Sequence, residues 1–415
     1  MRHTLAAWLH RNTASRPALI LGDESLSWTE LRHHAQALAE PGAAPLIVAA
    51  PNNRLALLAY AAGLAGRAFF PVDPARPADS WSRLVGPGGA AELIVATSGT
   101  TGAAKAVMLS ADNLRAHVAA SRARLGLQPD DVWLNPLPLF HVGGLMILWR
   151  CAEAGATAVL PHRFDVAAMA AALPAVTHVS LVPTMLARLL EAGVAPGPRL
   201  RVCLVGGAAL PGALAERALA AGWPLCPTYG MSEVASQVAT LVRAEPGWHP
   251  GTVGPALEGL EVALVENGRI RVRGAAVMLG YANPEMRPGD GLVDGWYETG
   301  DLGAWDEAGR LVVLGRADDM LISGGENVHP QTVEEVAARC PGVRAVGVTA
   351  RTDAEWGDRV VAVVVGEVTE AAFLAWCRDR LRPAERPKQM IHAESLPLNA
   401  TGKLDRTALR RSLAE

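Results

Sequence analysis

Short apolar runs alternate with longer helix-like stretches between about residues 45 and 240. We interpret the short runs as buried strands, at residues 46–48, 93–95, 156–160, 178–182 and 202–205. One intervening stretch, residues 110–125, is typical of a helix, because Ser110 suits the N-cap and Gly126 suits the position after the last turn. Strands that alternate with helices predict βαβ units. We therefore expect an α/β fold with a large N-terminal domain of mainly parallel sheets and helices.

The pattern changes after about residue 250. Strand-like residues 262–265 and 270–273 flank Asn267-Gly268, which predicts a two-residue β-hairpin. A second hairpin is expected to turn at residues 307–309. A small antiparallel β unit is therefore expected to follow the α/β body.

Residues from Asp318 onward are typical of a separate α+β module. We expect its helices near residues 332–339 and 370–381, and its strands near residues 343–348 and 360–365. The sequence thus predicts an N-terminal domain at residues 1–317 and a small mobile C-terminal domain at residues 318–415. The junction at residues 315–319 is short and charged. Such a junction favours a hinge between two defined orientations over free tumbling.

Composition narrows the class of protein. Hydrophobic residues make up 50% of the 415 residues and charged residues 19%, which excludes a disordered chain. A net charge of −3 gives no electrostatic reason to expect nucleic acid or an anionic membrane as a partner. Five cysteines without a C-x-x-C spacing argue against a disulfide framework or a zinc site. They favour a reducing compartment instead.

The sequence contains no segment that we interpret as a targeting or membrane-spanning element. Its first residues lack the apolar stretch of a signal peptide. The run at residues 166–187 carries no Asp, Glu, Lys or Arg, but it contains Pro174 and Pro183 and divides into a helix-like and a strand-like half. We interpret it as buried core. A cytoplasmic protein is therefore expected.

Lysine is scarce in this chain. Of the 38 basic residues only Lys105, Lys388 and Lys403 are lysines, which leaves 38 − 3 = 35 arginines. A chain that uses arginine wherever a general positive charge suffices has kept lysine at three positions. The compact ammonium group can contact several oxygens in turn, which a planar guanidinium does less well.

A loop rich in hydrogen-bond donors follows the expected strand at residues 93–95. Its sequence is Thr97-Ser98-Gly99-Thr100-Thr101-Gly102-Ala103-Ala104-Lys105. Four hydroxyls, two glycines and a lysine within nine residues suit the binding of phosphate oxygens. The loop is not a Walker A motif, because Lys105 lies three residues after Gly102. A polar surface turn is the alternative interpretation.

Four further motifs follow this loop in order. They are Tyr229-Gly230-Met231-Ser232-Glu233, Tyr297-Glu298-Thr299-Gly300-Asp301, Gly315-Arg316-Ala317-Asp318 and Asn399-Ala400-Thr401-Gly402-Lys403. Together with the loop they resemble the signatures of the acyl-adenylate-forming superfamily, which includes acyl-CoA ligases, luciferases and the adenylation domains of peptide synthetases. The resemblance spans nearly the whole chain.

The resemblance implies a role for each motif. By this resemblance, the residues expected to bind ATP are Thr97, Ser98, Gly99, Thr100, Thr101, Gly102, Lys105, Gly206, Gly207, Ala208, Tyr229 and Gly230. Glu233 is the ligand of Mg²⁺ on ATP, and the hydroxyl of Ser232 meets the α-phosphate. Asp301 accepts hydrogen bonds from both ribose hydroxyls, while Arg316 lies near the ribose and Asp318 is the pivot of the hinge. Lys403 is the catalytic lysine.

The expected chemistry explains these residue types. Activation of a carboxylate brings an anion against a triphosphate, so the developing negative charge has to be neutralised. An ionised aspartate such as Asp301 suits a ribose diol because it only accepts hydrogen bonds. Two positions depart from the usual pattern: Ala104 stands where proline is usual, and Ser232 stands where threonine is usual. Ser232 keeps the hydroxyl, and the loop keeps its donors.

Two segments concern the acyl group and the acceptor thiol. His141, within residues 138–144, corresponds by resemblance to a side chain that lines the acyl pocket and gates the thiol; the alternative is a structural histidine in a buried turn. Gly324 and Gly325 resemble the loop that packs near the pantetheine of coenzyme A, where small residues permit close approach. A tight turn after a strand is the alternative.

A narrower resemblance concerns the substrate. Residues 137–142, 177–184, 206–211 and 229–240 resemble the o-succinylbenzoate–CoA ligases of menaquinone synthesis, although benzoate- and anthranilate-type ligases share parts of these strings. An aromatic keto-diacid is therefore expected in the pocket. The polar candidates that would line it are His141, Ser180, Thr184 and Ser236. No arginine can be assigned to the distal carboxylate from the sequence.

Three hypotheses remain open from the sequence. The first is a ligase that uses ATP and Mg²⁺ to form an acyl-adenylate and then transfers the acyl group to coenzyme A. The second keeps the adenylation but transfers the acyl group to a separate carrier protein. The third is a non-catalytic nucleotide sensor, although the retention of Glu233, Asp301 and Lys403 disfavours it. The expected partners are small molecules, and a homodimer is a further expectation.

Overall fold

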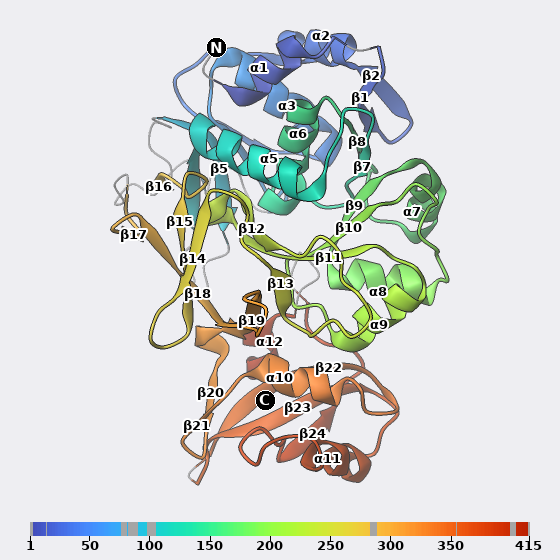
Figure 1. Cartoon of the computed structure of the whole chain (residues 1–415), viewed down its shortest axis with the longest axis vertical. Coiled ribbons are helices and arrows are strands. Elements are labelled where there is room, and N and C mark those ends of the chain that lie inside the picture. The colour runs from blue at the N-terminus through green and yellow to red at the C-terminus, as the bar shows by residue number, and fades with distance from the viewer. Residues whose placement is uncertain are drawn as a thin grey trace.

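The structure is a computed structural model that describes residues 3–13, 15–75, 81, 90–97, 105–282, 289–353, 355–398 and 404–413. Its described strands form four sheets. Figure 1 shows the sheet of the C-terminal residues at one end of the molecule, away from the other three.

The largest sheet has eight strands in the order β12-β11-β10-β9-β7-β8-β1-β2. From β11 to β1 neighbouring strands run parallel, whereas β12 and β2 are antiparallel at the two edges. The bounds are Pro17–Leu21 (β1), Glu24–Ser27 (β2), Val132–Leu134 (β7), Thr157–Leu160 (β8), His178–Leu181 (β9), Val202–Val205 (β10), Leu225–Met231 (β11) and Ser236–Thr240 (β12). The parallel arrangement confirms the predicted α/β fold class.

Helices connect the parallel strands of this sheet. The connections are α6 (Val142–Ala154) between β7 and β8, α7 (Val166–Ala172) and the 3₁₀ turn η1 (Leu173–Ala175) before β9, α8 (Pro183–Glu191) before β10 and α9 (Gly212–Ala220) before β11. The uncharged run at residues 166–187 thus divides into α7, β9 and the start of α8. Its interpretation as buried core is correct for β9, whereas in α7 only Met169 is buried. Within the described ranges, no helix has both the length and the apolar character needed to cross a membrane.

A second, five-stranded sheet has the order β16-β6-β5-β4-β3. Its strands are Leu46–Ala49 (β3), Phe69–Val72 (β4), Ala91–Thr97 (β5), Lys105–Ser110 (β6) and Gly280–Tyr281 (β16). Helices α1 (Thr4–Arg11), α2 (Trp28–Leu38), α3 (Asn52–Ala65) and α5 (Ala111–Leu125) lie with α6 at the N-terminal end of the molecule (Figure 1). Because β16 comes from much later in the chain, this sheet joins distant parts of the sequence.

Helix α5 has the ends that the sequence predicts. The Ser110 side chain accepts a hydrogen bond from the backbone N–H of Asn113 at 3.1 Å, and the Asn113 side chain in turn accepts from the N–H of Ser110 at 2.9 Å. Gly126 ends the helix in the left-handed conformation, with φ of 64°. Residues 110–125 were therefore interpreted correctly from their capping residues.

The third sheet is antiparallel, with the order β13-β19-β18-β15-β14 and with β17 beside β18. Its strands are Thr252–Gly254 (β13), Leu260–Leu264 (β14), Arg269–Gly274 (β15), Leu292–Val293 (β17), Trp296–Trp305 (β18) and Leu311–Arg316 (β19). The predicted hairpin at Asn267-Gly268 joins β14 to β15, and Gly268 has φ of 77°. The loop is longer than the predicted two residues, because hydrogen bonds of Val265 with Arg269 and Gly268 close it over residues 266–268. The second predicted hairpin joins β18 to β19, with Gly309 at φ of 69°.

The fourth sheet holds the C-terminal residues, in the order β21-β20-β23-β22 with β24 beside β23. Its elements are Leu321–Ser323 (β20), Glu326–Val328 (β21), Pro330–Ala337 (α10), Val343–Asp353 (β22), Gly357–Gly366 (β23), Glu370–Arg378 (α11), Gln389–His392 (β24) and Arg406–Arg411 (α12). The short turn η3 (Ala317–Asp319) leads into it from β19. Helices α10 and α11 begin within two residues of the predicted positions.

The hydrophobic cores follow the same division. One large core joins the N-terminal helices to the eight- and five-stranded sheets and includes Trp28, Trp133 and Trp149. A second core lies under α7, α8 and α9. Two further clusters, around Phe373 and around Leu409, contain only residues from 321 onward. The C-terminal part therefore has a core of its own.

Within the described ranges, polar contacts with α9 join the C-terminal part to the rest. The backbone N–H of Gly212, the first residue of α9, donates to both carboxylate oxygens of Glu335 on α10, at 3.0 and 2.9 Å. Arg339, which follows the end of α10, forms an ion pair with Glu216 of α9 at 2.9 Å. Figure 1 shows α10 facing α9. These contacts and the η3 turn position the C-terminal part.

Candidate active site

Several expected site residues lie at one edge of the eight-stranded sheet. His141 follows β7, Thr184 follows β9, and the segment Gly206, Gly207 and Ala208 follows β10. The motif that begins at Tyr229 occupies the end of β11. The carboxyl ends of parallel strands meet at one edge of a sheet, which is where α/β folds bind ligands. The topology thus brings together residues that are up to about a hundred positions apart.

Close backbone contacts hold the end of β11. A Cβ atom on Gly230 would lie 1.9 Å from the carbonyl oxygen of Ser236, so only glycine fits beside β12. Similarly, a Cβ on Gly206 would lie 2.6 Å from the Thr228 side chain, which brings the loop after β10 against β11. The expected nucleotide-binding segments of β10 and β11 are therefore neighbours.

The backbone next to Glu233 adopts unusual conformations. Glu233 lies in the short turn η2 (Ser232–Val234), and the next two residues, Ala235 and Ser236, have positive φ values of 54° and 121°. Residues other than glycine rarely adopt such angles, and each costs of the order of 1–3 kcal/mol when the surrounding structure enforces it. Strain of this kind is concentrated at functional sites. Here it sets the direction of the chain on either side of the β11–β12 turn.

The Glu233 carboxylate is buried and has a protein donor. The hydroxyl of Tyr281 donates to its Oε1 at 3.2 Å, and its backbone carbonyl accepts from the N–H of Met278 at 2.8 Å. No group of three or more His, Cys, Asp or Glu side chains suited to a metal occurs among the residues that the structure describes. A single carboxylate still fits Mg²⁺, which proteins commonly bind through one or two carboxylates together with substrate phosphates.

Asp301 lies where β18 pairs with β19. The two strands place Asp301 opposite Arg316, whose Nη1 is 3.4 Å from Asp301 Oδ1. The hydroxyl of Tyr229, from the eight-stranded sheet, donates to Oδ2 at 2.6 Å. Burial, together with the negative charge of Asp301, raises the pKa of Tyr229 well above its usual value, so the hydroxyl stays protonated. Asp301 is thus held by donors from two sheets.

Arg316 connects Asp301 to the expected hinge residue. Its Nη2 lies 3.4 Å from Oδ2 of Asp318, in the turn η3. Burial acts to lower the pKa of Arg316, but the carboxylates of Asp301 and Asp318 outweigh it, and the pKa is raised. The guanidinium therefore remains charged between the two aspartates.

Strands β5 and β6 flank the expected phosphate loop. Thr97 and Lys105 face each other in the antiparallel pair, and Thr97 Oγ1 donates to the Lys105 carbonyl at 3.4 Å. The Lys105 ammonium lies 4.9 Å from the centroid of the Tyr281 ring. Of the expected ATP-site and catalytic residues, Ser98, Gly99, Thr100, Thr101, Gly102 and Lys403 lie outside the described residues.

The structure distributes the acyl-pocket candidates over different environments. His141 is the N-cap of α6, and its ring lies 4.5 Å from that of Phe140. Ser180 is buried on β9, where its hydroxyl accepts from Trp133 Nε1 at 3.0 Å. Ser236 is buried on β12, whereas Thr184 is exposed on α8. Ser180 and Thr184 therefore differ sharply in access to solvent.

Gly324 and Gly325 belong to the C-terminal sheet. They form the two-residue turn between β20 and β21, with φ values of 60° and 79°. A Cβ on Gly324 would meet the Trp356 ring at 3.4 Å. The structure places this turn away from the edge that holds the other candidates (Figure 1).

Sequence reasoning gave no role to Tyr281 and none to the Tyr297 side chain. Tyr281 lies on β16 and Tyr297 on β18, yet both hydroxyls interact with Glu233. Their signal in the sequence is rarity, because the chain has only four tyrosines. The argument from rarity that distinguishes the three lysines holds for the four tyrosines as well.

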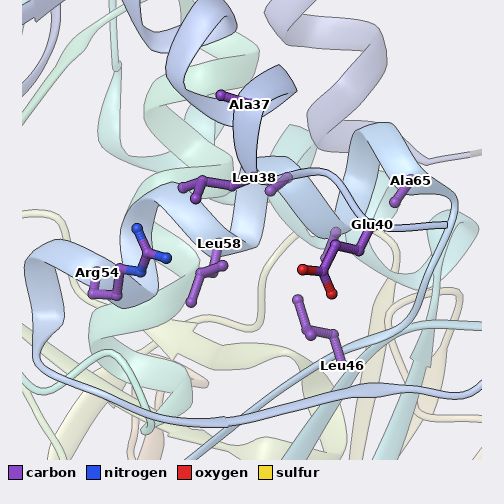
Figure 2. A pocket seen from close by; sticks show the side chains of 9 residues that line it. Ala37, Leu38, Glu40, Leu46, Arg54, Leu58 and Ala65 are labelled. Carbon is purple, nitrogen blue, oxygen red and sulfur yellow. The ribbon is translucent and has the colours of Figure 1, made fainter. Parts of the chain in front are cut away.

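A small cavity of ≈ 120 Å³ lies apart from this site. Figure 2 shows it between α2, α3 and the start of β3. Leu38, Leu46 and Leu58 line it, with Glu40 and Arg54 among the polar side chains. None of the expected site residues contributes to it.

The chain is similar to known proteins over most of its length. Residues 90–282 match the family of AMP-binding enzymes, and residues 332–403 match the AMP-binding enzyme C-terminal domain. A 2-succinylbenzoate–CoA ligase of Bacillus cereus (strain Q1) is 40% identical over 340 residues, which cover 78% of this chain and 71% of that protein.

Two solved structures of an o-succinylbenzoate coenzyme A synthetase from Bacillus subtilis also resemble the chain. The complex with ATP and magnesium ion gives a TM-score of 0.88 at 28% identity, covering 99% of each chain. A double mutant bound to a product analogue gives 0.69 at 28% identity, covering 99% of this chain and 98% of that one. The family matches, the relative and these structures together show that the chain belongs to the AMP-binding enzyme family.

Proposed function

We propose that the chain is an ATP- and Mg²⁺-dependent acid–thiol ligase whose carboxylate substrate is o-succinylbenzoate. In the first half-reaction the substrate carboxylate attacks the α-phosphate of ATP, which forms an acyl-adenylate and releases pyrophosphate. In the second, the thiol of coenzyme A attacks the acyl carbon, which forms the thioester and releases AMP. The observation that carries the proposal is the placement of Glu233 and Asp301, two buried or half-buried carboxylates with tyrosine donors, beside one sheet edge.

The metal would be held by Glu233 and by phosphate oxygens of ATP, where it would neutralise negative charge during displacement of pyrophosphate. Asp301 would accept hydrogen bonds from the ribose hydroxyls, with Arg316 beside it. The loop from Thr97 to Lys105 would donate to the phosphates. Together these groups would hold ATP in one position relative to the substrate carboxylate.

Lys403 would complete the charge neutralisation from the C-terminal part. Its ammonium would contact both the attacking carboxylate and the phosphate. His141 would line the acyl pocket together with Ser180, Thr184 and Ser236, and Gly324 and Gly325 would pack near pantetheine. For the second half-reaction the C-terminal part would rotate about Asp318, so Asp318→Pro is expected to slow the passage from the first half-reaction to the second. Unchanged rates of both half-reactions would contradict this hinge.

The substrate assignment rests on the relatives, whose names specify 2-succinylbenzoate or o-succinylbenzoate. A panel of carboxylates tests it, with AMP and thioester measured in each reaction. We expect o-succinylbenzoate to give equal amounts of both products, and benzoate and anthranilate to give far less. Adenylate formation without a thioester of coenzyme A would instead favour transfer to a carrier protein.

The role of Lys403 separates an enzyme from a nucleotide sensor. Lys403→Ala is expected to lower adenylate formation by about 100-fold or more, the effect of losing one contact to developing charge. Lys388→Ala is the matched control, since Lys388 lies over the Trp356 ring at 4.0 Å, outside the ATP motifs. Unchanged ATP turnover in Lys403→Ala would contradict the catalytic assignment.

The proposal also includes a cellular location and an oligomeric state. All five cysteines are free and buried, which supports a reducing compartment and a cytoplasmic location. A homodimer stays a prediction that light scattering of the purified chain tests.

A further inference from the structure

Three of the four tyrosines in this chain lie against the two carboxylates of the candidate site. Tyr229 donates to Asp301, and Tyr281 donates to Glu233. Tyr297 lies close enough to Tyr281 and Glu233 for both to raise the pKa of its hydroxyl. The fourth tyrosine, Tyr60, is buried in the large core on α3. A residue type that is otherwise nearly absent is therefore concentrated at the two acidic positions.

The Tyr281 ring is held on several sides. Its backbone, on β16, pairs with Val107 of β6, two residues from Lys105. Gly291 approaches the ring so closely that a Cβ there would lie 2.8 Å from Tyr281 Cε2. The Lys105 ammonium lies 4.9 Å from the centroid of the ring. With 3% of its surface exposed, Tyr281 has little freedom to turn away from Glu233.

The Tyr281 hydroxyl donates to Oε1 of Glu233 at 3.2 Å, and the contact is buried. A carboxylate that binds a metal is commonly oriented by a hydrogen bond to one of its oxygens, and loss of such a partner weakens metal binding. Tyr281 makes this kind of contact with Oε1 of Glu233.

We propose that Tyr281, supported by Tyr297, is a positioning residue that orients the Glu233 carboxylate for the metal ion on ATP. The inference deepens the ligase function proposed above and rests on it. The ammonium of Lys105 lies over the same ring in a cation–π contact. Tyr281 therefore also sets the position of the phosphate-loop lysine relative to the metal-binding carboxylate. The metal-binding carboxylate and the ammonium of the phosphate loop, which come from different segments, thereby contact one side chain.

The test measures ATP binding by the full chain at a series of free Mg²⁺ concentrations, by calorimetry, without carboxylate substrate or coenzyme A. Tyr281→Phe is expected to raise the Mg²⁺ concentration needed for half-maximal ATP binding by about tenfold, the lower end of effects seen when a ligand loses its orienting partner. ATP affinity in the presence of a chelator is expected to stay at the wild-type value. Tyr297→Phe is expected to have a smaller effect in the same direction.

Tyr60→Phe is the matched control, because it removes a buried tyrosine hydroxyl outside the site. It is expected to leave the Mg²⁺ dependence unchanged. Wild-type Mg²⁺ dependence in Tyr281→Phe would overturn the proposal, as would an equal loss of ATP affinity with and without Mg²⁺. If Tyr281→Phe does not fold, Tyr297→Phe decides by the same criteria.

The two proposals fail in different ways. Because the binding assay contains no carboxylate, an incorrect substrate assignment leaves its result intact. Mg²⁺-dependent ATP binding without activation of o-succinylbenzoate would overturn the substrate alone. If ATP binding by the wild type does not depend on Mg²⁺, both the proposed function and the proposed role of Tyr281 are overturned.

Discussion

The Tyr229 hydroxyl donates to Oδ2 of Asp301 at 2.6 Å and thereby links the eight-stranded sheet to the antiparallel β18–β19 pair. Arg316 contacts the other oxygen at 3.4 Å. Both oxygens of this carboxylate therefore face protein donors in the structure. A ribose diol that binds Asp301 has to share these oxygens or replace a donor, so the carboxylate is fixed in place before the nucleotide arrives.

Asp301→Asn is expected to weaken ATP binding by roughly tenfold or more, because hydrogen bonds to a charged group are worth about 1.5–3 kcal/mol. Calorimetric titration with ATP and Mg²⁺ measures the change. Asp112→Asn is a suitable control, since Asp112 lies on the exposed surface of α5 and pairs with Arg115 in the same helix. An unchanged dissociation constant in Asp301→Asn would contradict the assignment of the ribose site.

Gly230→Ala is expected to destabilise the fold and to impair Mg²⁺-dependent ATP binding together. The new methyl group would lie 1.9 Å from the Ser236 carbonyl, and the contact is with backbone, so β11 and β12 would have to move apart next to Glu233. We expect a loss of at least about 1–3 kcal/mol, the usual cost of overpacking. Urea unfolding and ATP titration provide the two measurements.

Gly42→Ala serves as the comparison for that variant. Its nearest neighbour would be the flexible Arg67 side chain at 3.4 Å, and Gly42 does not require a positive φ. Stability and ATP binding are expected to stay near wild type. Equal behaviour of Gly42→Ala and Gly230→Ala would show that the contact with Ser236 is unimportant.

Stability is expected to fall below about pH 6.5 because two histidines are buried in neutral form. Burial, followed by the positive charge of Arg150, holds the pKa of His117 well below its usual range. Burial lowers the pKa of His178 to about 4, although Asp131 at 4.0 Å opposes this shift. Unfolding lets both rings take up protons below their unfolded pKa of about 6.5, so the folded state loses up to about 1.4 kcal/mol per pH unit for each ring.

Urea unfolding between pH 7 and pH 5 measures this slope. His117→Gln is expected to reduce it by about half, since glutamine can still accept a hydrogen bond from Arg150 but does not titrate. The exposed His162→Gln is expected to keep the wild-type slope. A slope in His117→Gln that equals the wild-type slope would contradict the assignment.

Glu335→Ala is expected to slow adenylate formation about three- to tenfold and to leave thioester formation from preformed adenylate unchanged. The substitution removes both acceptors for the Gly212 N–H and one partner of Arg339, which weakens the contact between α9 and α10. The structure, with α10 against α9, overlays the relative's ATP complex with a TM-score of 0.88. Its TM-score with the relative's product-analogue complex is 0.69. The contact therefore belongs to the arrangement that resembles the ATP complex.

Single-turnover measurements of each half-reaction test that expectation. Glu394→Ala is the control, because Glu394 is an exposed carboxylate in the C-terminal part. Equal slowing of both half-reactions by Glu335→Ala would point to general damage, and would contradict a role specific to this orientation.

Local chemistry explains which features the sequence could predict. The ends of α5 follow from Ser110 and Gly126, and the β14–β15 hairpin follows from Asn267-Gly268. These features depend on a few adjacent residues. The motifs around Glu233 and Asp301 were recognised because their residue types are contiguous.

Features that depend on distant contacts were not predicted. β16 pairs with β6 across more than 170 residues and thereby brings Tyr281 to Glu233, and no local pattern marks that partnership. The positive φ values of Ala235 and Ser236 likewise arise from the packing of β12 against β11 rather than from their own preferences. The buried contact between Arg150 and His117 joins α6 to α5, and no local sequence pattern predicts that these two helices pack together.

The separate core of the C-terminal part has a consequence for calorimetry. Phe373 and Leu409 lie in clusters that share no residue with the large N-terminal core, and the polar contacts between α9 and α10 are partly exposed. Cooperativity requires that cores unfold together. Heating is therefore expected to produce two heat-absorption peaks, so one melting temperature would describe neither part, and the effect of each variant has to be assigned to its own peak.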